Sequence, residues 1–256
     1  AFGSVGKVRY EIVIEGTEAA EAVRFRCRGR GQRIPCRTVF LHHGVVPNTQ
    51  AARSLGIGHR WDSRQQCFSP VLDGWGESDQ PGVFITGDGA GIGGALVAEV
   101  AGRLAALKVA CDLQGLGVAE RDRQAAALRR QLEREQAARP FLDTVYPPAA
   151  EAVLPADDTI VCRCEEVTAG DIRRYARLGC LGPNQTKAFG RSGMGPCQGR
   201  YCGLTVTALL AEANGRTPEQ TGYYRIRPPF KPVTLGELAA MADAPFETAD
   251  SGEQHD

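Results

Sequence analysis

The sequence predicts a mixed α/β fold built from two domains, and three observations support this. Short runs that alternate apolar and polar residues near the N-terminus predict strands. A glycine-rich turn at residues 87–94 stands between an apolar run and a long helical pattern. Further along, four cysteines form two close pairs, and each pair precedes a helical pattern. A chain of 256 residues is long enough for two small domains.

Three strands are expected in the first part of the chain. The run from Lys7 to Glu15 alternates apolar and polar residues, and turn signals follow at Gly16 and at residues 29–31. The second and third strands are expected at residues 22–27 and 34–41. Because short turns connect them in order, we expect the three strands to form a meander.

The middle of the chain predicts a strand and three helices. A short helix is expected at residues 50–55, and a strand at residues 83–86 leads into the glycine turn. A helical pattern at residues 95–111 follows that turn. Residues 119–139 are rich in Arg, Glu, Gln and Ala, which suits an exposed helix that Pro140 ends. We interpret this last helix as the connection between the two domains.

The composition excludes two classes of partner. Thirty basic residues balance thirty acidic ones, so the chain has no overall charge that would attract nucleic acid or an anionic membrane surface. The longest apolar stretches are far shorter than the roughly 20 residues that a membrane span needs. We therefore expect no nucleic-acid partner and no membrane span.

The distribution of the nine cysteines indicates a reducing compartment. Four of them form two tight pairs and five are scattered singly, unlike the disulfide framework of a small secreted protein. No charged and then apolar leader precedes the first expected strand, so we expect a cytoplasmic protein. The chain opens at Ala1 without a methionine, which suggests a fragment or a processed chain.

The two cysteine pairs supply four thiolates. The first pair has the spacing C-x-C and the second C-x-x-x-x-C; the four residues are Cys162, Cys164, Cys197 and Cys202. Four is the number that a 2Fe-2S centre needs. Tetrahedral zinc also accepts four cysteines, although structural zinc sites usually contain a C-x-x-C knuckle, and reduced structural cysteines are a further alternative. Spacing alone leaves these three interpretations open.

The residues around the cysteines favour an anionic group. Thr168 with Asp171 predicts a capping box that begins a helix at residues 168–178, and Cys202 leads into a second helix at residues 203–213. Helix N-termini carry a partial positive charge that favours an anionic cluster. The glycine-rich run at residues 190–196 is expected to pass close to the sulfur atoms and to donate hydrogen bonds. Three cations add positive charge there: Lys187, Arg191 and Arg200.

This cysteine region resembles the cluster domain related to bacterioferritin-associated ferredoxin. The resemblance rests on residues 160–167, on Lys187 and on residues 191–202. It extends to the version of this domain at the C-terminus of the flavoprotein subunits of opine oxidase, hydroxyproline dehydrogenase and hydrogen cyanide synthase. The segment at residues 227–233 is similar to the end of that group. The resemblance implies a 2Fe-2S cluster on the four cysteines.

The glycine turn satisfies G-x-G-x-x-G at residues 89–94, but a lone match is a weak signal. In a Rossmann unit a second strand that ends in an acidic residue should follow the helix. After Cys111 the sequence instead predicts a turn and a charged helix. The turn is therefore not expected to be a first dinucleotide fingerprint, and a turn that binds no ligand remains an alternative.

The turn is more similar to the second flavin motif of two-dinucleotide flavoproteins, where an apolar strand ends in Gly-Asp before a helix. By this resemblance Asp88 accepts a hydrogen bond from a ribityl hydroxyl of FAD, and residues 42–49 are similar to the segment that precedes the motif. The residues implied to contact FAD are Gly87, Asp88, Gly89, Gly91, Gly93 and Gly94. The glycine turn that holds the ADP half of FAD in such proteins is absent from these residues, so only half of an FAD site is expected.

The resemblance also implies how the chain is divided. Residues 1–117 would be the C-terminal portion of an FAD/NAD(P)-binding flavoprotein domain, and residues 118–156 a helical linker. Residues 157–235 would form the 2Fe-2S domain with its tail, and residues 236–256 a partly disordered C-terminal tail.

The function implied is that of an oxidoreductase subunit in a flavin-dependent amino-acid or opine dehydrogenase. The chain would pass electrons between FAD and the cluster, and a second flavoprotein subunit would oxidise the amino acid or opine. No catalytic acid, base or nucleophile is assigned in this chain, and alone it is expected to be inactive. The alternatives are a non-enzymatic iron-sulfur module and a zinc-stabilised interaction domain. His42 and His43 are expected to be packing or surface residues, and the five single cysteines are expected to be small buried hydrophobic residues.

Overall fold

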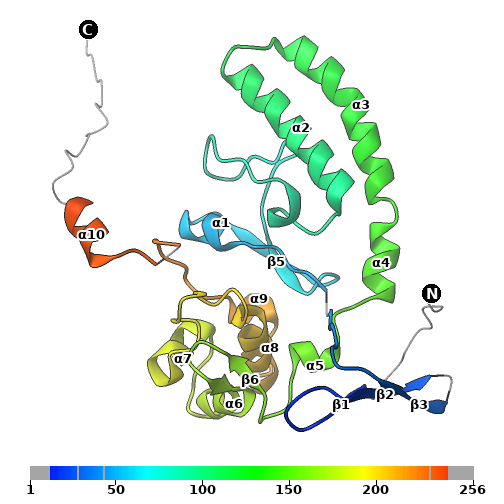
Figure 1. Cartoon of the computed structure of the whole chain (residues 1–256). Coiled ribbons are helices and arrows are strands. Elements are labelled where there is room, and N and C mark those ends of the chain that lie inside the picture. Colours follow the sequence, from blue (N-terminus) through cyan, green and yellow to red (C-terminus); the bar gives the residue numbers. More distant parts are fainter. Residues whose placement is uncertain (1–11, 28, 43, 231, 242–256) are drawn as a thin grey trace. The chain divides into compact units, whose positions relative to one another are not determined.

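The computed structural model describes residues 12–27, 29–42, 44–230 and 232–241, and its fold is mixed α/β, as the sequence predicts (Figure 1). The chain divides into two compact units, residues 1–44 and residues 45–256. Within the described residues, every helix is too short or too polar to pass through a lipid bilayer.

The first unit is a three-stranded antiparallel sheet. Its strands are β1 (Val13–Glu15), β2 (Ala22–Cys27) and β3 (Arg30–Pro35), in the order β1-β2-β3. The predicted meander and the bounds of β2 are confirmed. The prediction for the third strand is wrong, because β3 pairs with β2 from Arg30 onward and ends at Pro35. All six residues of β3 are exposed, so the strand lacks the apolar alternation that marks a half-buried strand. Residues 7–11 of the first predicted strand lie outside the described residues.

The second unit opens with the short helix α1 (Gln50–Ser54) and a hairpin of β4 (His59–Asp62) and β5 (Cys67–Pro70). The predicted helix at residues 50–55 is confirmed. The predicted strand at residues 83–86 is wrong, because only Phe84 pairs there, through one isolated bridge to Glu77. The chain turns back on itself just before this segment, so residues 76–78 lie antiparallel to it. Only two hydrogen bonds join them, from the N-H of Ser78 to the carbonyl of Val83 and from the N-H of Ile85 to the carbonyl of Gly76, and this contact is too short to form a regular strand.

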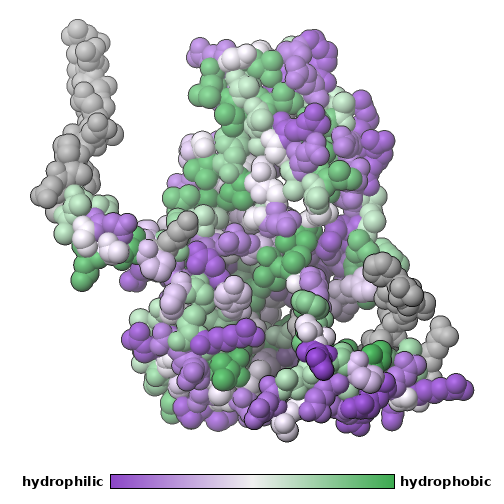
Figure 2. Space-filling view, viewed as in Figure 1, coloured by the Kyte–Doolittle hydropathy of each residue, from purple (hydrophilic) through white to green (hydrophobic). Residues whose placement is uncertain are grey.

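Three helices follow the glycine turn: α2 (Ala95–Asp112), α3 (Val118–Gln136) and α4 (Arg139–Val145). The first two form an antiparallel hairpin, and hydrophilic residues gather on the outer side of α3 (Figures 1 and 2). Both predicted helices are confirmed. The prediction that Pro140 ends the second one is wrong, because α3 ends at Gln136 and Pro140 lies in the first turn of α4. A proline fits there because the first helical N-H groups need no helical acceptor.

The C-terminal part of this unit, from residue 150 onward, is called the cysteine region here. Its helices surround a two-stranded ribbon that β6 (Ile160–Cys162) and β7 (Val167–Thr168) form. Helices α6 and α8 pack against each other, and their core includes Ile172, Val206 and Leu209. Both helices were predicted from the sequence, and Thr168 with Asp171 forms the expected capping box. The elements are α5 (Ala150–Val153), β6 (Ile160–Cys162), β7 (Val167–Thr168), α6 (Ala169–Arg177), α7 (Pro183–Gly190), α8 (Gly203–Ala213), α9 (Pro218–Thr221) and α10 (Leu235–Met241).

The capping box gives a prediction for stability. Asp171 accepts hydrogen bonds from the N-H and the hydroxyl of Thr168, and the N-H bond chiefly lowers the pKa of this carboxyl. Asp171→Ala should lower the free energy of unfolding by about 0.5–1 kcal/mol near neutral pH. Because the folded pKa is depressed, this loss should be full above the ordinary pKa of 3.8 and vanish as the pH falls through the folded value.

Urea unfolding at several pH values measures this effect. The exposed Glu133→Ala in α3 is the matched control, with an expected change within about 0.5 kcal/mol. A cost for Asp171→Ala that stays the same at low pH would show that the carboxylate charge does not support the helix.

Candidate functional site

The structure brings the four predicted cysteines together from two separate segments of the chain. Cys162 ends β6, Cys164 follows it in the turn of the ribbon, Cys197 lies in the loop before α8, and Cys202 caps the N-terminus of α8. They meet as two pairs: the thiol of Cys164 interacts with that of Cys197, and the thiol of Cys202 interacts with that of Cys162. The two pairs are also close enough to influence each other's charge.

The site has a buried side and an accessible side. Cys162 and Cys202 are each 1% exposed, whereas Cys197 is partly buried and Cys164 is exposed. Burial, and after it the neighbouring Cys162, raise the pKa of the Cys202 thiol to about 12. A metal that binds Cys202 would therefore have to displace a proton that the metal-free protein holds tightly.

The loop after Cys197 favours the thiolate form of this residue. Burial tends to raise the pKa of the Cys197 thiol, but the N-H of Tyr201, the thiol of Cys164 and the N-H groups of Gly199 and Arg200 together lower it. The sequence predicted that residues 190–196 would donate such hydrogen bonds. For Cys197 the donors instead lie at residues 199–201, because the chain turns back over the sulfur directly after it.

The glycines before the second pair are needed for close packing. A Cβ atom on Gly195 would lie 2.1 Å from the Cβ of Cys164, so no side chain fits between the two segments. Side chains on Gly193 or Gly199 would each meet the ring of Tyr224 at 2.6 Å. The expected close approach of residues 190–196 to the cysteines is confirmed.

Tyr224 is a residue of this site that the sequence analysis missed. It is 2% exposed, its hydroxyl donates to the Oγ of Ser192 at 3.1 Å, and the Sγ of Cys202 lies 4.0 Å from the same hydroxyl. Burial raises the pKa of Tyr224, so the hydroxyl keeps its proton. It accepts from the Cys202 thiol, and it can turn its own proton from Ser192 toward this sulfur when Cys202 is a thiolate. Tyr224 stands 22 residues beyond Cys202 in a segment without a recognisable motif, so no sequence signal could have found it.

The three predicted cations lie at different distances from the sulfur atoms. Lys187 lies over the ring of Tyr224, with its Nζ 4.9 Å from the ring centroid, and burial lowers its pKa. Arg200 donates to the carbonyl of Cys197 at 3.2 Å. Arg191 forms an ion pair with Glu165 at 2.9 Å, so part of its charge is already compensated.

Within the described residues, no three His, Cys, Asp or Glu side chains gather closely enough to hold one metal ion.

The second candidate site is the glycine turn, which the structure places beside a cavity of about 410 Å³. Gly87 and Asp88 form a single 3₁₀ turn with Gly89, and α2 begins at Ala95. Gly87 has φ +65° and Gly94 has φ +102°, a backbone conformation that favours glycine. The six predicted cofactor residues come together here, and all of them except Gly89 line the cavity.

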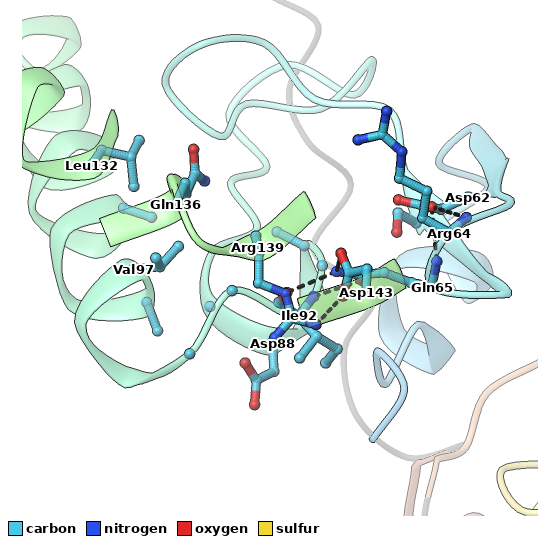
Figure 3. A pocket seen from close by; sticks show the side chains of 18 of the residues that line it. Asp62, Arg64, Gln65, Asp88, Ile92, Val97, Leu132, Gln136, Arg139 and Asp143 are labelled. Atoms are coloured by element: carbon cyan, nitrogen blue, oxygen red, sulfur yellow. Dashed lines mark hydrogen bonds and ion pairs between the residues drawn. The ribbon is translucent and has the colours of Figure 1, made fainter. Parts of the chain in front are cut away.

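The opposite wall of this cavity was missed by the sequence analysis. Gln65 accepts from the N-H of Ile92 at 3.2 Å and donates to its carbonyl at 2.9 Å, which fixes the turn just before α2. Arg139 forms an ion pair with Asp143, and Gln65 donates to the same carboxylate at 3.4 Å. Figure 3 shows Arg139 and Gln65 converging on Asp143, while Asp88 points away from this group. Gln65 lies in the turn between β4 and β5, whereas Arg139 and Asp143 lie in α4. No local sequence motif connects these elements.

The remaining predictions for single residues are borne out in part. His42 is exposed, as expected for a surface residue, and His43 lies outside the described residues. Among the single cysteines, Cys67 and Cys180 are buried as predicted, whereas Cys27, Cys36 and Cys111 are only partly buried. All nine cysteines are in the described part of the chain, and none of them forms a disulfide.

Comparison with known proteins links this chain to components of oxidoreductases. Residues 157–242 match the family model of the sarcosine oxidase A3 domain, and this range contains the four paired cysteines. An opine oxidase subunit of Rhizobium meliloti is 45% identical over 231 residues, which are 90% of this chain and 44% of that protein. Hydrogen cyanide synthase subunit HcnB of Pseudomonas aeruginosa is 32% identical over 205 residues, which are 78% of this chain and 43% of that protein.

The chain thus spans about half the length of the curated relatives it matches. The resemblance to opine oxidase and hydrogen cyanide synthase subunits that the sequence motifs indicated is confirmed. Among solved structures, an L-proline dehydrogenase from P. horikoshii has the same fold, with a TM-score of 0.67 and 20% identity. The match covers 89% of this chain and 44% of that one.

Proposed function

We propose that this chain is an electron-transferring part of a flavin-dependent oxidoreductase subunit, with a 2Fe-2S cluster on Cys162, Cys164, Cys197 and Cys202. The observation that carries the proposal is the convergence of these four thiols in two pairs. The similarity to subunits named opine oxidase and hydrogen cyanide synthase supports an oxidoreductase over a protein that only binds a metal.

The pairing favours a binuclear centre over zinc. A 2Fe-2S cluster takes four cysteine thiolates, two on each iron, and the two pairs seen here match that division. The three backbone N-H groups near Cys197, the hydroxyl of Tyr224 near Cys202 and the N-terminus of α8 all favour negative charge on sulfur. When they are bound, FAD supplies hydride chemistry and the cluster accepts or releases single electrons.

The glycine turn is proposed to hold the ribityl and ring part of FAD. In support, Gly87 and Asp88 line the 410 Å³ cavity together with the residues that lead into α2. The N-terminus of α2 also lies at this turn, where its positive end favours an electron-rich group. In this role Asp88 accepts a hydrogen bond from a ribityl hydroxyl, and the group formed by Gln65, Arg139 and Asp143 forms the opposite wall.

We further infer that a second flavoprotein subunit oxidises the substrate, an amino acid or an opine. The relatives are themselves named as subunits, which supports a partner. No catalytic acid or base is assigned to this chain, so its own residues would bind and orient the two cofactors. A cytoplasmic location suits nine cysteines without a disulfide.

Transfer of electrons from reduced FAD tests this function. Reduced FAD carries two electrons and a 2Fe-2S cluster takes one, so about half an equivalent should reduce all of the cluster. On anaerobic mixing we expect the visible absorption of the cluster to fall while that of oxidised flavin appears. Iron-containing protein whose absorption does not change would contradict the electron-transfer role. A zinc-containing protein that takes no electrons would support the zinc-stabilised interaction domain instead.

The half site predicts weak binding of FAD by these 256 residues alone. The cavity at the turn suits the ring and ribityl part, but the ADP half normally rests on a first glycine turn, and the sequence contains no second G-x-G-x-x-G. We expect well under one FAD per chain after gel filtration. Titration with free FAD should show weak binding that Asp88→Ala weakens further, by roughly tenfold for one hydrogen bond to a charged group.

Fluorescence of FAD measures both quantities, with the exposed Asp122→Ala as the matched control. Two results would contradict the role proposed for the turn. One is FAD that stays bound at one molecule per chain, and the other is an equal affinity for FAD in Asp88→Ala and the control.

A further inference from the structure

Helix α1 connects the two candidate sites. At its first position Gln50 is 3% exposed, and its side-chain Nε2 donates to the main-chain carbonyl of Gln198 at 3.0 Å. Gln198 stands directly after Cys197. One turn further along α1, the guanidinium of Arg53 lies 4.3 Å from the ring centroid of Tyr223. The hydroxyl of Tyr223 donates to the carbonyl of Gly199 at 3.2 Å.

Gln198 is held in an unusual conformation by several hydrogen bonds. Its φ is +50°, which is uncommon for a residue other than glycine and needs support from its surroundings. Its N-H donates to the carbonyl of Gly195 at 2.8 Å, and its side chain donates to the carbonyl of Pro229 at 2.7 Å. Of these three bonds, the bond from Gln50 is the one that comes from outside the cysteine region.

The residues that lead into α1 also lie near the glycine turn. A Cβ atom built on Gly89 would lie 3.8 Å from the carbonyl oxygen of Asn48. The side-chain oxygen of Asn48 accepts from the N-H of Gln50 at 3.4 Å. Asn48 therefore lies beside the glycine turn, and hydrogen bonds lead from Asn48 through Gln50 to Gln198, the neighbour of Cys197.

The polar atoms at this junction show how closely it is packed. The side-chain oxygens of Gln50 and Gln198 and one guanidinium nitrogen of Arg53 are buried without a partner among the described residues. Burial also lowers the pKa of Arg53 to about 10. A junction that buries such groups is costly and does not form from apolar packing alone, so the specific bond between Gln50 and Gln198 defines its geometry.

We propose that Gln50 is a positioning residue. It holds the turn that contains Cys197 at a fixed position relative to the glycine turn. The proposal rests on the function proposed above, because the relative position of the two turns matters for electron transfer only if both cofactors bind. Without the bond from Gln50, the turn at Gln198 should open more often, and Cys197 should be held less closely in place relative to the glycine turn.

Two measurements on Gln50→Leu test this, with the exposed Gln124→Leu in α3 as the matched control. The first uses metal-free reduced protein, in which the rate of alkylation of Cys197 is read by peptide mass spectrometry. We expect about a fivefold faster reaction in Gln50→Leu, as for the loss of one hydrogen bond, with buried Cys180 unchanged. The second is the rate at which reduced FAD bleaches the cluster, which should fall by about fivefold at unchanged iron content.

The two measurements separate the inference from the proposed function. If the protein binds no iron, the proposed function fails, and the alkylation rate still decides whether Gln50 holds the turn. If Cys197 reacts equally fast in Gln50→Leu and Gln124→Leu, the positioning role is overturned. If Cys197 is alkylated faster in Gln50→Leu but electron transfer keeps its rate, Gln50 does not set the relative position of the two cofactor sites. The inference is overturned in that case too.

Discussion

Replacing Cys197 with Ser is expected to remove most of the iron from the protein, whereas replacing Cys180 with Ser leaves the iron content unchanged. The sulfur of Cys197 lies beside the thiol of Cys164 and accepts from three backbone N-H groups. These neighbours suit a thiolate that binds a metal ion. Cys180 is 3% exposed and belongs to the apolar core of the cysteine region. Serine removes a soft thiolate ligand in the first case and only a buried thiol in the second.

Iron, acid-labile sulfide and visible absorption of both variants, prepared anaerobically, measure the difference. Circular dichroism verifies that each variant folds, because a serine hydroxyl in place of the buried Cys180 thiol costs about 1–3 kcal/mol. Equal loss of iron in the two variants would mean that the ligands are wrongly assigned.

Gly195→Ala is expected to have the second largest effect. The added methyl group would lie 2.1 Å from the Cβ of Cys164, closer than two carbon atoms can approach without bonding. The ribbon and the loop before α8 must then separate, which moves Cys164 away from Cys197. We expect the iron content to fall to a small fraction of the unchanged protein and the free energy of unfolding to drop by about 1–3 kcal/mol.

Gly102→Ala is the matched control for this variant. Gly102 lies within α2 with open space around it, so alanine should keep the iron and raise stability by up to about 1 kcal/mol. A Gly195→Ala protein with full iron content would show that the two cysteine segments are not held together as closely as the structure indicates.

The sequence predicted the elements whose signals are local. The bounds of β2 and α8, the capping box at Thr168 and the helix α2 all follow from periodicity and capping residues within a few positions. The four cysteines could be found because paired spacing is itself the signal. These parts of the fold and of the site needed no knowledge of distant contacts.

The other parts depend on contacts between residues far apart in the chain. Tyr224 lies 22 positions from Cys202 in the sequence, and Gln50 lies 148 positions from Gln198. Only the folding of the chain brings these residues into contact. The strand β3 was misplaced because its residues are exposed and polar, so hydrogen bonding to β2 defines it rather than any apolar pattern.

The metal and sulfide content of anaerobically prepared protein tests the central claim most directly. Four thiols in two pairs, with N-H donors and a helix N-terminus beside them, should hold about two iron atoms and about two sulfides per chain, and the protein should be brown. Stoichiometric zinc in a colourless protein would contradict the claim.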